Sequence, residues 1–184
     1  MNKPSIEHRP RSRGFSLLEL LATLAIIAVV SAAAAPSFQQ LIAKYRVAGE
    51  RSALKGAILT ARDTGRNGAA ATLCASTNGS TCTTSAWRDG YIVFTDGGAK
   101  GVVDGADRIL LAGQAAKPNL SIAATDFASG TAFTDTVIQF GTDGVASVTT
   151  PVLFTLCQTG VTPQQVVVRR NGNITSPKAT GICP

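Results

Sequence analysis

The feature that most constrains this chain is an apolar run from Phe15 to Ala35 that contains one acid, Glu19. As a helix, these 21 residues would span about 30 Å at 1.5 Å per residue, which matches the hydrocarbon thickness of a bilayer. An ionised carboxyl group at that depth costs about 2.5–3.5 kcal/mol and usually marks a site with a partner. The sequence therefore predicts one transmembrane helix with a functional acid inside it.

Basic residues precede the apolar run. Residues 1–14 hold four of the 17 Lys and Arg and one of the 11 Asp and Glu, so the formal net charge of +6 falls to +3 without them. Short basic flanks stay in the cytoplasm, whereas long domains are translocated regardless of their charge. We therefore expect a single-pass membrane protein with a cytoplasmic N terminus and an exported C-terminal domain. The mildly basic remainder is weak evidence for a nucleic-acid partner.

A cleaved secretory signal peptide is the alternative to a membrane span. A basic start, an apolar core and small residues at 32–35 would also fit cleavage before Pro36. The acid inside the run disfavours this alternative, and so does an apolar pattern that continues beyond Pro36 at helical spacing. The continuing residues are Phe38, Leu41, Ile42 and Tyr45. Pro36 itself needs no special role, because proline often kinks a helix or marks its exit from a membrane.

Residues 14–19 read Gly-Phe-Ser-Leu-Leu-Glu, and the apolar run that follows ends at Pro36. This stretch resembles the class III leader of type IV pilins and pseudopilins. The resemblance implies that a prepilin peptidase cleaves after Gly14 and methylates the new N terminus, Phe15. Glu19 then becomes the fifth residue of the mature chain. The resemblance also implies that Pro36 lets the helix bend or locally melt in a filament.

The predicted assembly residues are Phe15, Glu19 and Pro36. An anionic Glu19 in lipid needs a compensating charge, and the free amine of a neighbouring subunit's Phe15 supplies one when subunits are staggered along the filament axis. One buried pair would then encode the register of the assembly.

Beyond the membrane run, the pattern predicts one helix to about Arg66 with an apolar stripe that packs on a sheet. This stripe begins at Phe38 and continues through Leu54, Ala57, Ile58 and Ala61. Gly65 and Gly68 are expected stops. The basic residues of this helix predict a solvated face that reaches toward lipid headgroups near its start. They are Lys44, Arg46, Arg51, Lys55, Arg62 and Arg66.

From residue 70 onward, short apolar runs alternate with turn residues and predict antiparallel strands. The expected strands are 91–95, 108–112, 120–123, 136–140, 151–157 and 165–169. This layout is α+β, with the long helix covering one face of an antiparallel sheet and room for a second small sheet. We divide the chain into a cleaved leader (1–14), a transmembrane helix (15–35), an amphipathic continuation (36–66) and a periplasmic β-rich domain (67–184).

The segment 87–96 reads Trp-Arg-Asp-Gly-Tyr-Ile-Val-Phe-Thr-Asp. Together with residues 104–110, it is similar to the signature of the GspH/FimT pseudopilin family, in which a tryptophan and a glycine open a hairpin that ends in a Gly/Asp-rich turn. Residues 140–144 and 154–157 fit the same family. The resemblance implies the pseudopilin fold. It also implies as partners other minor and major pseudopilins or pilins, the prepilin peptidase and the inner-membrane assembly platform.

All four cysteines lie on the predicted exported side, where disulfides can form. Of the three possible pairings, we favour Cys74–Cys82, which closes a short polar loop. We also favour Cys157–Cys183, which ties the tail to a strand and would contribute about 2–4 kcal/mol. Zinc is disfavoured because there is no Cys-x-x-Cys pair and no histidine after His8.

Catalysis and cofactors find little support in the residue inventory. The only histidine precedes the apolar run, and no Gly-x-Ser-x-Gly motif is present, so we expect neither an enzyme nor a cofactor. Asp96, Asp104 and Asp107 lie among glycines, but their spacing fails the EF-hand template. We therefore expect a plain turn there rather than a calcium site.

The best candidates for a DNA contact are Arg169, Arg170 and Lys178. Family members that bind DNA during natural transformation tend to carry Gly-Arg-x-Arg in this C-terminal loop, whereas residues 172–175 here read Gly-Asn-Ile-Thr. Phosphate binding generally recruits several cations, and adjacent arginines on a strand point to opposite faces. The resemblances of the leader and of the hairpin imply a non-catalytic minor pseudopilin or pilin of the bacterial inner membrane, at the tip of a periplasmic filament of a type II secretion system or type IV pilus. DNA binding is the alternative.

Overall fold

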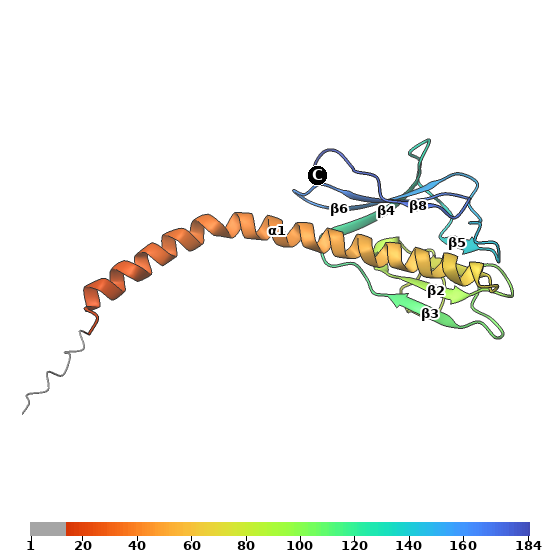
Figure 1. Cartoon of the computed structure of the whole chain (residues 1–184), viewed down its shortest axis with the longest axis horizontal. Helices are drawn as coiled ribbons and strands as arrows, with labels where there is room; N and C mark the ends of the chain where they lie inside the picture. Colours follow the sequence, from red (N-terminus) through yellow and green to blue (C-terminus); the bar gives the residue numbers. More distant parts are fainter. Residues whose placement is uncertain (1–13) are drawn as a thin grey trace, which may run out of the picture. The chain divides into compact units, whose positions relative to one another are not determined.

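The computed structural model describes residues 14–184, and the leader before Gly14, with His8 and the predicted cytoplasmic cations, lies outside the described residues. In the described part, one 50-residue helix, α1 (Leu17–Arg66), precedes a series of short strands (Figure 1). The chain divides into two compact units, one ending at Gln39 and one comprising Gln40–Pro184.

The first unit consists of the apolar part of α1. Its helix is long and apolar enough to cross a membrane. Ser16 caps its N terminus, since the Ser16 hydroxyl accepts a hydrogen bond from the Glu19 backbone N–H at 3.2 Å. The helix is continuous through Pro36, although this proline has no N–H to donate to the carbonyl four residues before it. Away from its two ends, the helix satisfies its other peptide groups internally, as a lipid environment requires.

The first sheet of the second unit has the strand order β3-β2-β1-β5, with all neighbours antiparallel. Its strands are β1 (Ala71–Ala75), β2 (Tyr91–Thr95), β3 (Ile109–Gly113) and β5 (Val137–Phe140). β1 was not predicted from the sequence. All five of its residues are buried, so both faces are covered and the strand lacks the alternation of polar and apolar residues that would reveal it.

The second sheet has the order β4-β6-β7-β8, again antiparallel. Its strands are β4 (Leu120–Asp126), β6 (Val152–Gln158), β7 (Gln164–Val168) and β8 (Ile174–Thr175). Trp87, on a short 3-10 turn before β2, packs edge-on against Phe154 of β6 with ring centroids 5.0 Å apart. The two-residue β8 is too short to produce a sequence signal.

One hydrophobic core joins the second half of α1 to both sheets. The helix contributes Ala43, Val47, Leu54, Ala57, Ile58 and Ala61 to this core. A smaller cluster of Cys74, Ile92 and Phe94 lies on the other face of the first sheet. These contacts confirm the predicted layout of a helix packed on antiparallel sheet.

The predicted apolar stripe was wrong at its start. Phe38, Leu41 and Tyr45 are 63%, 47% and 71% exposed, and burial on the helix begins at Ala43 and Val47 instead. Helical periodicity identifies an apolar stripe, but it does not tell which part of the stripe the folded domain covers.

The helix ends at Arg66, as predicted, and Gly68 terminates it with a φ of 95°. The Ala69 N–H bonds to the Thr64 carbonyl at 3.4 Å and the Gly68 N–H to the Gly65 carbonyl at 2.9 Å, which is the Schellman pattern. Gly65 lies against β5: a Cβ placed there would sit 2.5 Å from the Gly141 carbonyl oxygen. The last turn of α1 therefore approaches the first sheet at a distance that only glycine allows.

We predict opposite effects from two Gly→Ala changes in α1. Gly65→Ala should destabilise the protein by about 1–3 kcal/mol, because the added methyl meets a backbone oxygen that cannot move aside. Gly56→Ala should stabilise it by about 0.5–1 kcal/mol, because a Cβ there meets nothing within 4 Å and alanine is the better helix former. Fluorescence of the sole tryptophan, Trp87, during urea unfolding in detergent measures both. Shifts of the same sign would contradict this account.

Candidate assembly site

The N-terminal residues of the described chain are open to a partner. Gly14 and Phe15 precede α1 and are exposed. Glu19 lies in the first turn of α1, where the helix dipole favours a negative charge. Within residues 14–184, Glu19 has no ion-pair partner. Its carboxylate is therefore free to meet a cation from another chain.

The apolar side chains around Glu19 are uncovered as well. The large apolar residues from Phe15 to Val30 are all more than half exposed. A helix that is apolar on all sides needs lipid or other helices around it. The first unit thus presents an apolar helical surface, long enough to cross a membrane, that carries one carboxylate.

Two disulfides join the four cysteines, with Cα–Cα distances of 5.6 Å for Cys74–Cys82 and 5.7 Å for Cys157–Cys183. The first fixes the polar loop after β1 to the buried Cys74 side of the first sheet. The second fixes the C-terminal tail to β6, and the Cys183 N–H adds a bond to the Val161 carbonyl at 2.9 Å. Both pairings are the ones that the sequence analysis favours.

The three aspartates of the β2–β3 loop accept hydrogen bonds from backbone N–H groups of the loop, and Asp96 also accepts one from β1. Asp96 is buried and accepts from the Gly101 N–H at 2.8 Å and from the Thr72 hydroxyl. Asp104 accepts from the Ala99 N–H at 3.2 Å, and Asp107 from the Gly97 N–H at 3.1 Å. These carboxylates therefore brace a tight turn.

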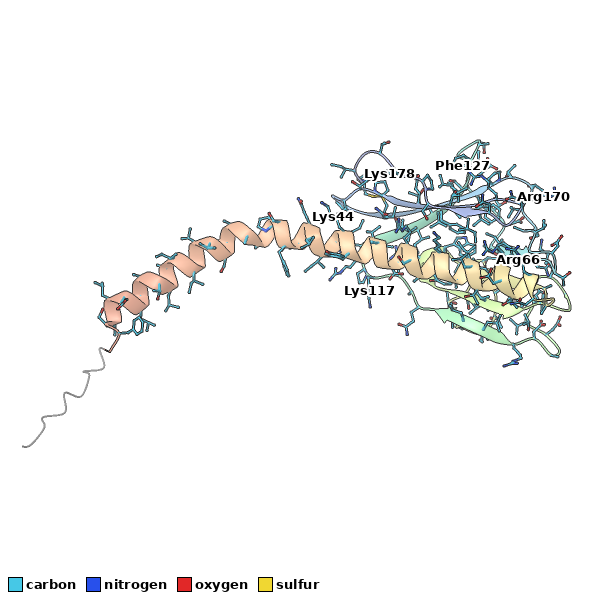
Figure 2. All side chains as sticks on the ribbon, viewed as in Figure 1. Lys44, Arg66, Lys117, Phe127, Arg170 and Lys178 are labelled. Atoms are coloured by element: carbon cyan, nitrogen blue, oxygen red, sulfur yellow. A yellow bond between two sulfur atoms is a disulfide. The ribbon has the colours of Figure 1, made fainter. Side chains whose placement is uncertain are left out.

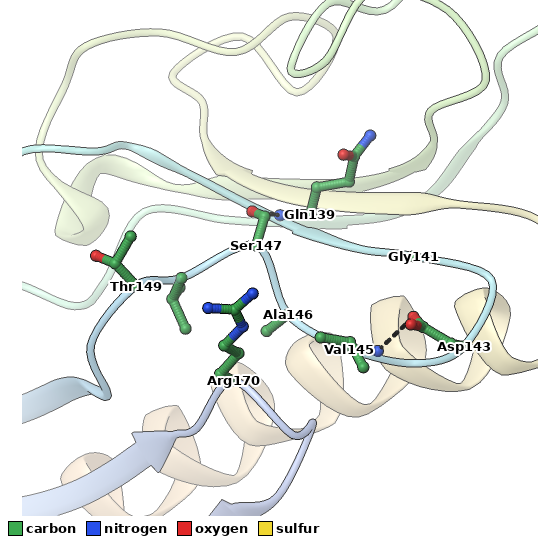
Figure 3. Close-up of a pocket in the computed structure, with 9 residues that line it drawn as sticks. Gln139, Gly141, Asp143, Val145, Ala146, Ser147, Thr149 and Arg170 are labelled. Carbon is green, nitrogen blue, oxygen red and sulfur yellow. Dashed lines mark hydrogen bonds between the residues drawn. The ribbon is translucent and has the colours of Figure 1, made fainter.

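The structure does not bring the three candidate DNA contacts together. Arg169 follows β7, and its Nη1 donates to the Thr175 hydroxyl at 2.8 Å. Arg170 projects into a cavity of about 340 Å³ that is also lined by Asp143 and Ser147 (Figure 3). Lys178 pairs with Gln164, at the opposite end of β7 (Figure 2). The arginines and the lysine therefore belong to different ends of the second sheet.

The expected solvated face of α1 is only partly solvated. Arg51 and Arg62 are half-buried, and both reach the second sheet. Arg51 Nη1 donates to Gln164 Oε1 at 3.0 Å, and Arg62 Nη1 donates to the Gly172 carbonyl at 3.4 Å. Arg62 also pairs with the exposed Asp63 at 2.8 Å. No local sequence signal distinguishes these arginines from exposed ones, because their partners are more than 100 residues away along the chain.

The sequence profile of a family described as Type II transport protein GspH matches residues 51–172, and a profile described as the prokaryotic N-terminal methylation motif matches residues 9–35. The chain belongs to the GspH family. A search of curated proteins returned no match. Two solved structures of the type IV minor pilin FimU of Pseudomonas aeruginosa are similar, in space groups P21 and P65. They are 19% and 16% identical, cover 73% and 75% of this chain and 98% of their own, and have TM-scores of 0.48 and 0.47.

Membership of the GspH family accounts for both the apolar helix and the β-rich domain of this chain. Pilins and pseudopilins are structural rather than enzymatic proteins, and they assemble with other pilins after a prepilin peptidase acts on them. The methylation-motif match includes Gly14, Phe15 and Glu19, and the GspH match runs from the middle of α1 to the turn after β7. The GspH domain is thus attached to a helix suited to anchor it in a membrane.

A partly buried acid, Glu50, lies on α1 directly before the first residue of the GspH match. Burial raises the pKa of Glu50, and the nearby Lys117 opposes that shift. Burial, with Glu50 as a second cause, raises the pKa of Tyr91 to about 12. For Glu50, a folded pKa above the unfolded value means that the folded state binds more protons. This residue therefore lowers stability progressively as pH rises above about 4.5, its ordinary value.

We predict that Glu50→Gln makes the protein more stable than the wild type at pH 7, with the difference shrinking toward pH 4. Neutral glutamine removes the cost of a half-buried charge, which is present only where Glu50 is ionised. Melting curves followed by Trp87 fluorescence between pH 4 and pH 8 test this, with Asp135→Asn as the control at an exposed acid. A constant offset at every pH would mean that the charge of Glu50 is not the cause.

Proposed function

We propose that this protein is a minor pseudopilin or pilin that is cleaved after Gly14, methylated at Phe15 and incorporated at the tip of a periplasmic filament. The observation that carries the proposal is Glu19, a carboxylate with no ion-pair partner among residues 14–184, inside an apolar helix that the methylation motif matches. Assembly, rather than catalysis, is the chemistry that such a group supports.

Electrostatics explains why the acid favours an ordered assembly. In lipid, an unpaired Glu19 costs about 2.5–3.5 kcal/mol, and the amine of a neighbouring subunit's Phe15 offsets that cost. Four residues separate the two groups in sequence, which corresponds to about 6 Å along a helix. The amine of a neighbouring subunit comes level with Glu19 when that subunit is displaced along the filament axis by roughly 6 Å. The length of the glutamate side chain adds to the displacement over which the two charges can meet. Unstaggered neighbours do not form this pair.

The charge distribution supports the orientation that assembly in the periplasm requires. Residues 1–14 hold Lys3, Arg9, Arg11 and Arg13, and short basic flanks remain cytoplasmic. The second unit would then fold in the periplasm, where its two disulfides can form. Residues 15–35 serve as the membrane span, and Pro36 marks the place where α1 can bend or locally melt on entering the filament.

The machine served is either a type II secretion system or a type IV pilus. The match to Type II transport protein GspH supports the first. A gene deletion distinguishes the two systems when both the release of secreted proteins and pilus-dependent motility are measured. Loss of release alone assigns the protein to secretion, and loss of motility alone assigns it to a pilus.

We predict that the mature protein begins at Phe15 and carries one methyl group on its amine. Mass spectrometry of the intact N terminus measures both the cleavage site and the methylation. A chain that begins at Pro36 would establish ordinary signal-peptide cleavage and remove the membrane helix from the mature protein. A chain that retains Met1 would contradict processing altogether.

We predict that Glu19→Ala leaves cleavage intact but lowers incorporation into filaments at least tenfold. The lost pairing corresponds to about 2.5–3.5 kcal/mol, and each 1.4 kcal/mol is a factor of ten. Thr23→Val on the same helix is the control, because the Thr23 hydroxyl bonds only to the Leu20 carbonyl of its own helix. The measurement is the fraction of the protein in sheared filaments. Equal incorporation of both variants would refute the role of Glu19.

A further inference from the structure

Two adjoining cavities lie beside α1 in the second unit, between the helix and the start of β7. One, of about 370 Å³, is lined by Leu41, Lys44 and Tyr45 of the helix. The other, of about 250 Å³, is lined by Arg51, Ser176 and Lys178. Thr162 and Gln164 line both cavities, so the two are neighbours, and we call them together the α1–β7 groove. Figure 2 shows Lys44 and Lys178 near the same end of the second unit.

The groove contains hydrogen-bond donors that the chain does not use. Arg51 Nε and Ser176 Oγ are buried and have no hydrogen-bond partner among the described residues. Arg51 is held in place because its Nη1 bonds to Gln164 Oε1 at 3.0 Å. Lys178 is exposed at the edge and forms no ion pair within residues 14–184. Burying such donors without an acceptor costs free energy. A group with oxygen acceptors would therefore gain free energy by binding there.

The positive charge of the groove indicates that the group it binds is an anion. Lys44, Arg51 and Lys178 line it, and no aspartate or glutamate does. Arginine Nε–H and a lysine ammonium form their strongest hydrogen bonds with carboxylate or phosphate oxygens. Leu41 and Tyr45, both largely exposed, supply apolar surface directly beside the cations. The groove therefore fits an anionic group that has an apolar neighbour.

We propose that the α1–β7 groove receives a carboxylate side chain, flanked by an apolar residue, from an adjacent subunit of the filament. The carboxylate first meets the exposed Lys178, and the segment that carries Ser176 and Lys178 shifts so that the carboxylate can also accept from Arg51 Nε and Ser176 Oγ, which are buried before the partner binds. The apolar residue covers Leu41 and Tyr45. This assignment rests on the proposed function, because it takes a neighbouring pilin as the partner.

A lipid phosphate matches the groove less well than a subunit carboxylate. Sixteen residues of continuous helix separate Ala35 from Arg51, which is about 24 Å of contour. The headgroup layer on each side of a bilayer is only about 5–8 Å thick. Arg51 therefore lies farther along the helix from Ala35 than the headgroup layer is thick.

The first test measures filament incorporation of the full-length protein in cells. We expect Arg51→Gln and Lys178→Gln each to lower incorporation roughly fivefold or more, because each removes one of the two positive charges that face the partner's carboxylate. Arg46→Gln, which changes an exposed cation of the same helix outside the groove, should have no effect. Lys178 is exposed, so its variant remains informative if Arg51→Gln fails to fold.

A photo-crosslinking residue at Thr162 identifies the occupant. We expect it to join the protein to another filament subunit, and Arg51→Gln should abolish the product. A product with phospholipid alone would overturn the proposal. Normal incorporation of wild type, Arg51→Gln and Lys178→Gln would also overturn it, while leaving the proposed function intact.

A second test observes Arg51 directly. In detergent micelles, NMR of the full-length protein should show the Arg51 Nε–H resonance moving as sodium acetate replaces sodium chloride at constant ionic strength. Arg51→Lys identifies the resonance by its absence, and Lys178→Gln should weaken the response several-fold. No movement would overturn the carboxylate site. Movement without incorporation of the wild type into filaments would refute the proposed function and the subunit assignment together.

Discussion

The whole architecture depends on one helix meeting two different environments. The first half of α1 leaves its apolar side chains uncovered, whereas the second half buries Val47, Leu54 and Ile58 in a protein core. Because an α-helix satisfies its own backbone groups, the same element can serve in lipid and in the folded domain. Side-chain chemistry alone then decides which half meets which environment. Glu19 is the exception in the apolar half, because an ionised carboxylate is costly in lipid without a partner.

Small residues make the second half of α1 a suitable centre for the domain. Ala57, Ala61 and Gly65 are buried, and the close approach of Gly65 to Gly141 shows how tightly the last turn meets β5. Larger side chains supply the volume from the sheets, as Phe140 and Phe154 do. Packing of this kind fixes the helix relative to its domain, because dense cores tolerate little displacement. The disulfides secure loop and tail regions where that core provides fewer contacts.

Local patterns predicted this fold well wherever local chemistry determines the structure. The apolar run, the end of α1 at Arg66 and the strands β2 to β7 each follow from periodicity and turn residues. β1 was missed because it is buried on both faces. The solvated face predicted for Arg51 was wrong for another reason, and the sequence did not show that Lys178 lies at the other end of β7 from Arg169 and Arg170. The environment of both residues depends on the return of β7 and the tail beside α1, a long-range contact that sequence spacing does not encode.

In an assembly of related subunits, the axial register between neighbours and the choice of neighbour depend on different interactions. A pair between Glu19 and a terminal amine is strong in lipid, but every subunit with the same leader offers the same two groups, so the pair cannot distinguish one neighbour from another. Specificity is a difference between the affinities of competing partners. It therefore has to arise outside the membrane, where the subunits differ. A groove with unused donors favours a neighbour that brings a carboxylate and disfavours one that leaves Arg51 unpaired. The charge pair of Glu19 would thus set the register at the start of α1. Contacts at Arg51 would select the neighbour at a later part of the same helix.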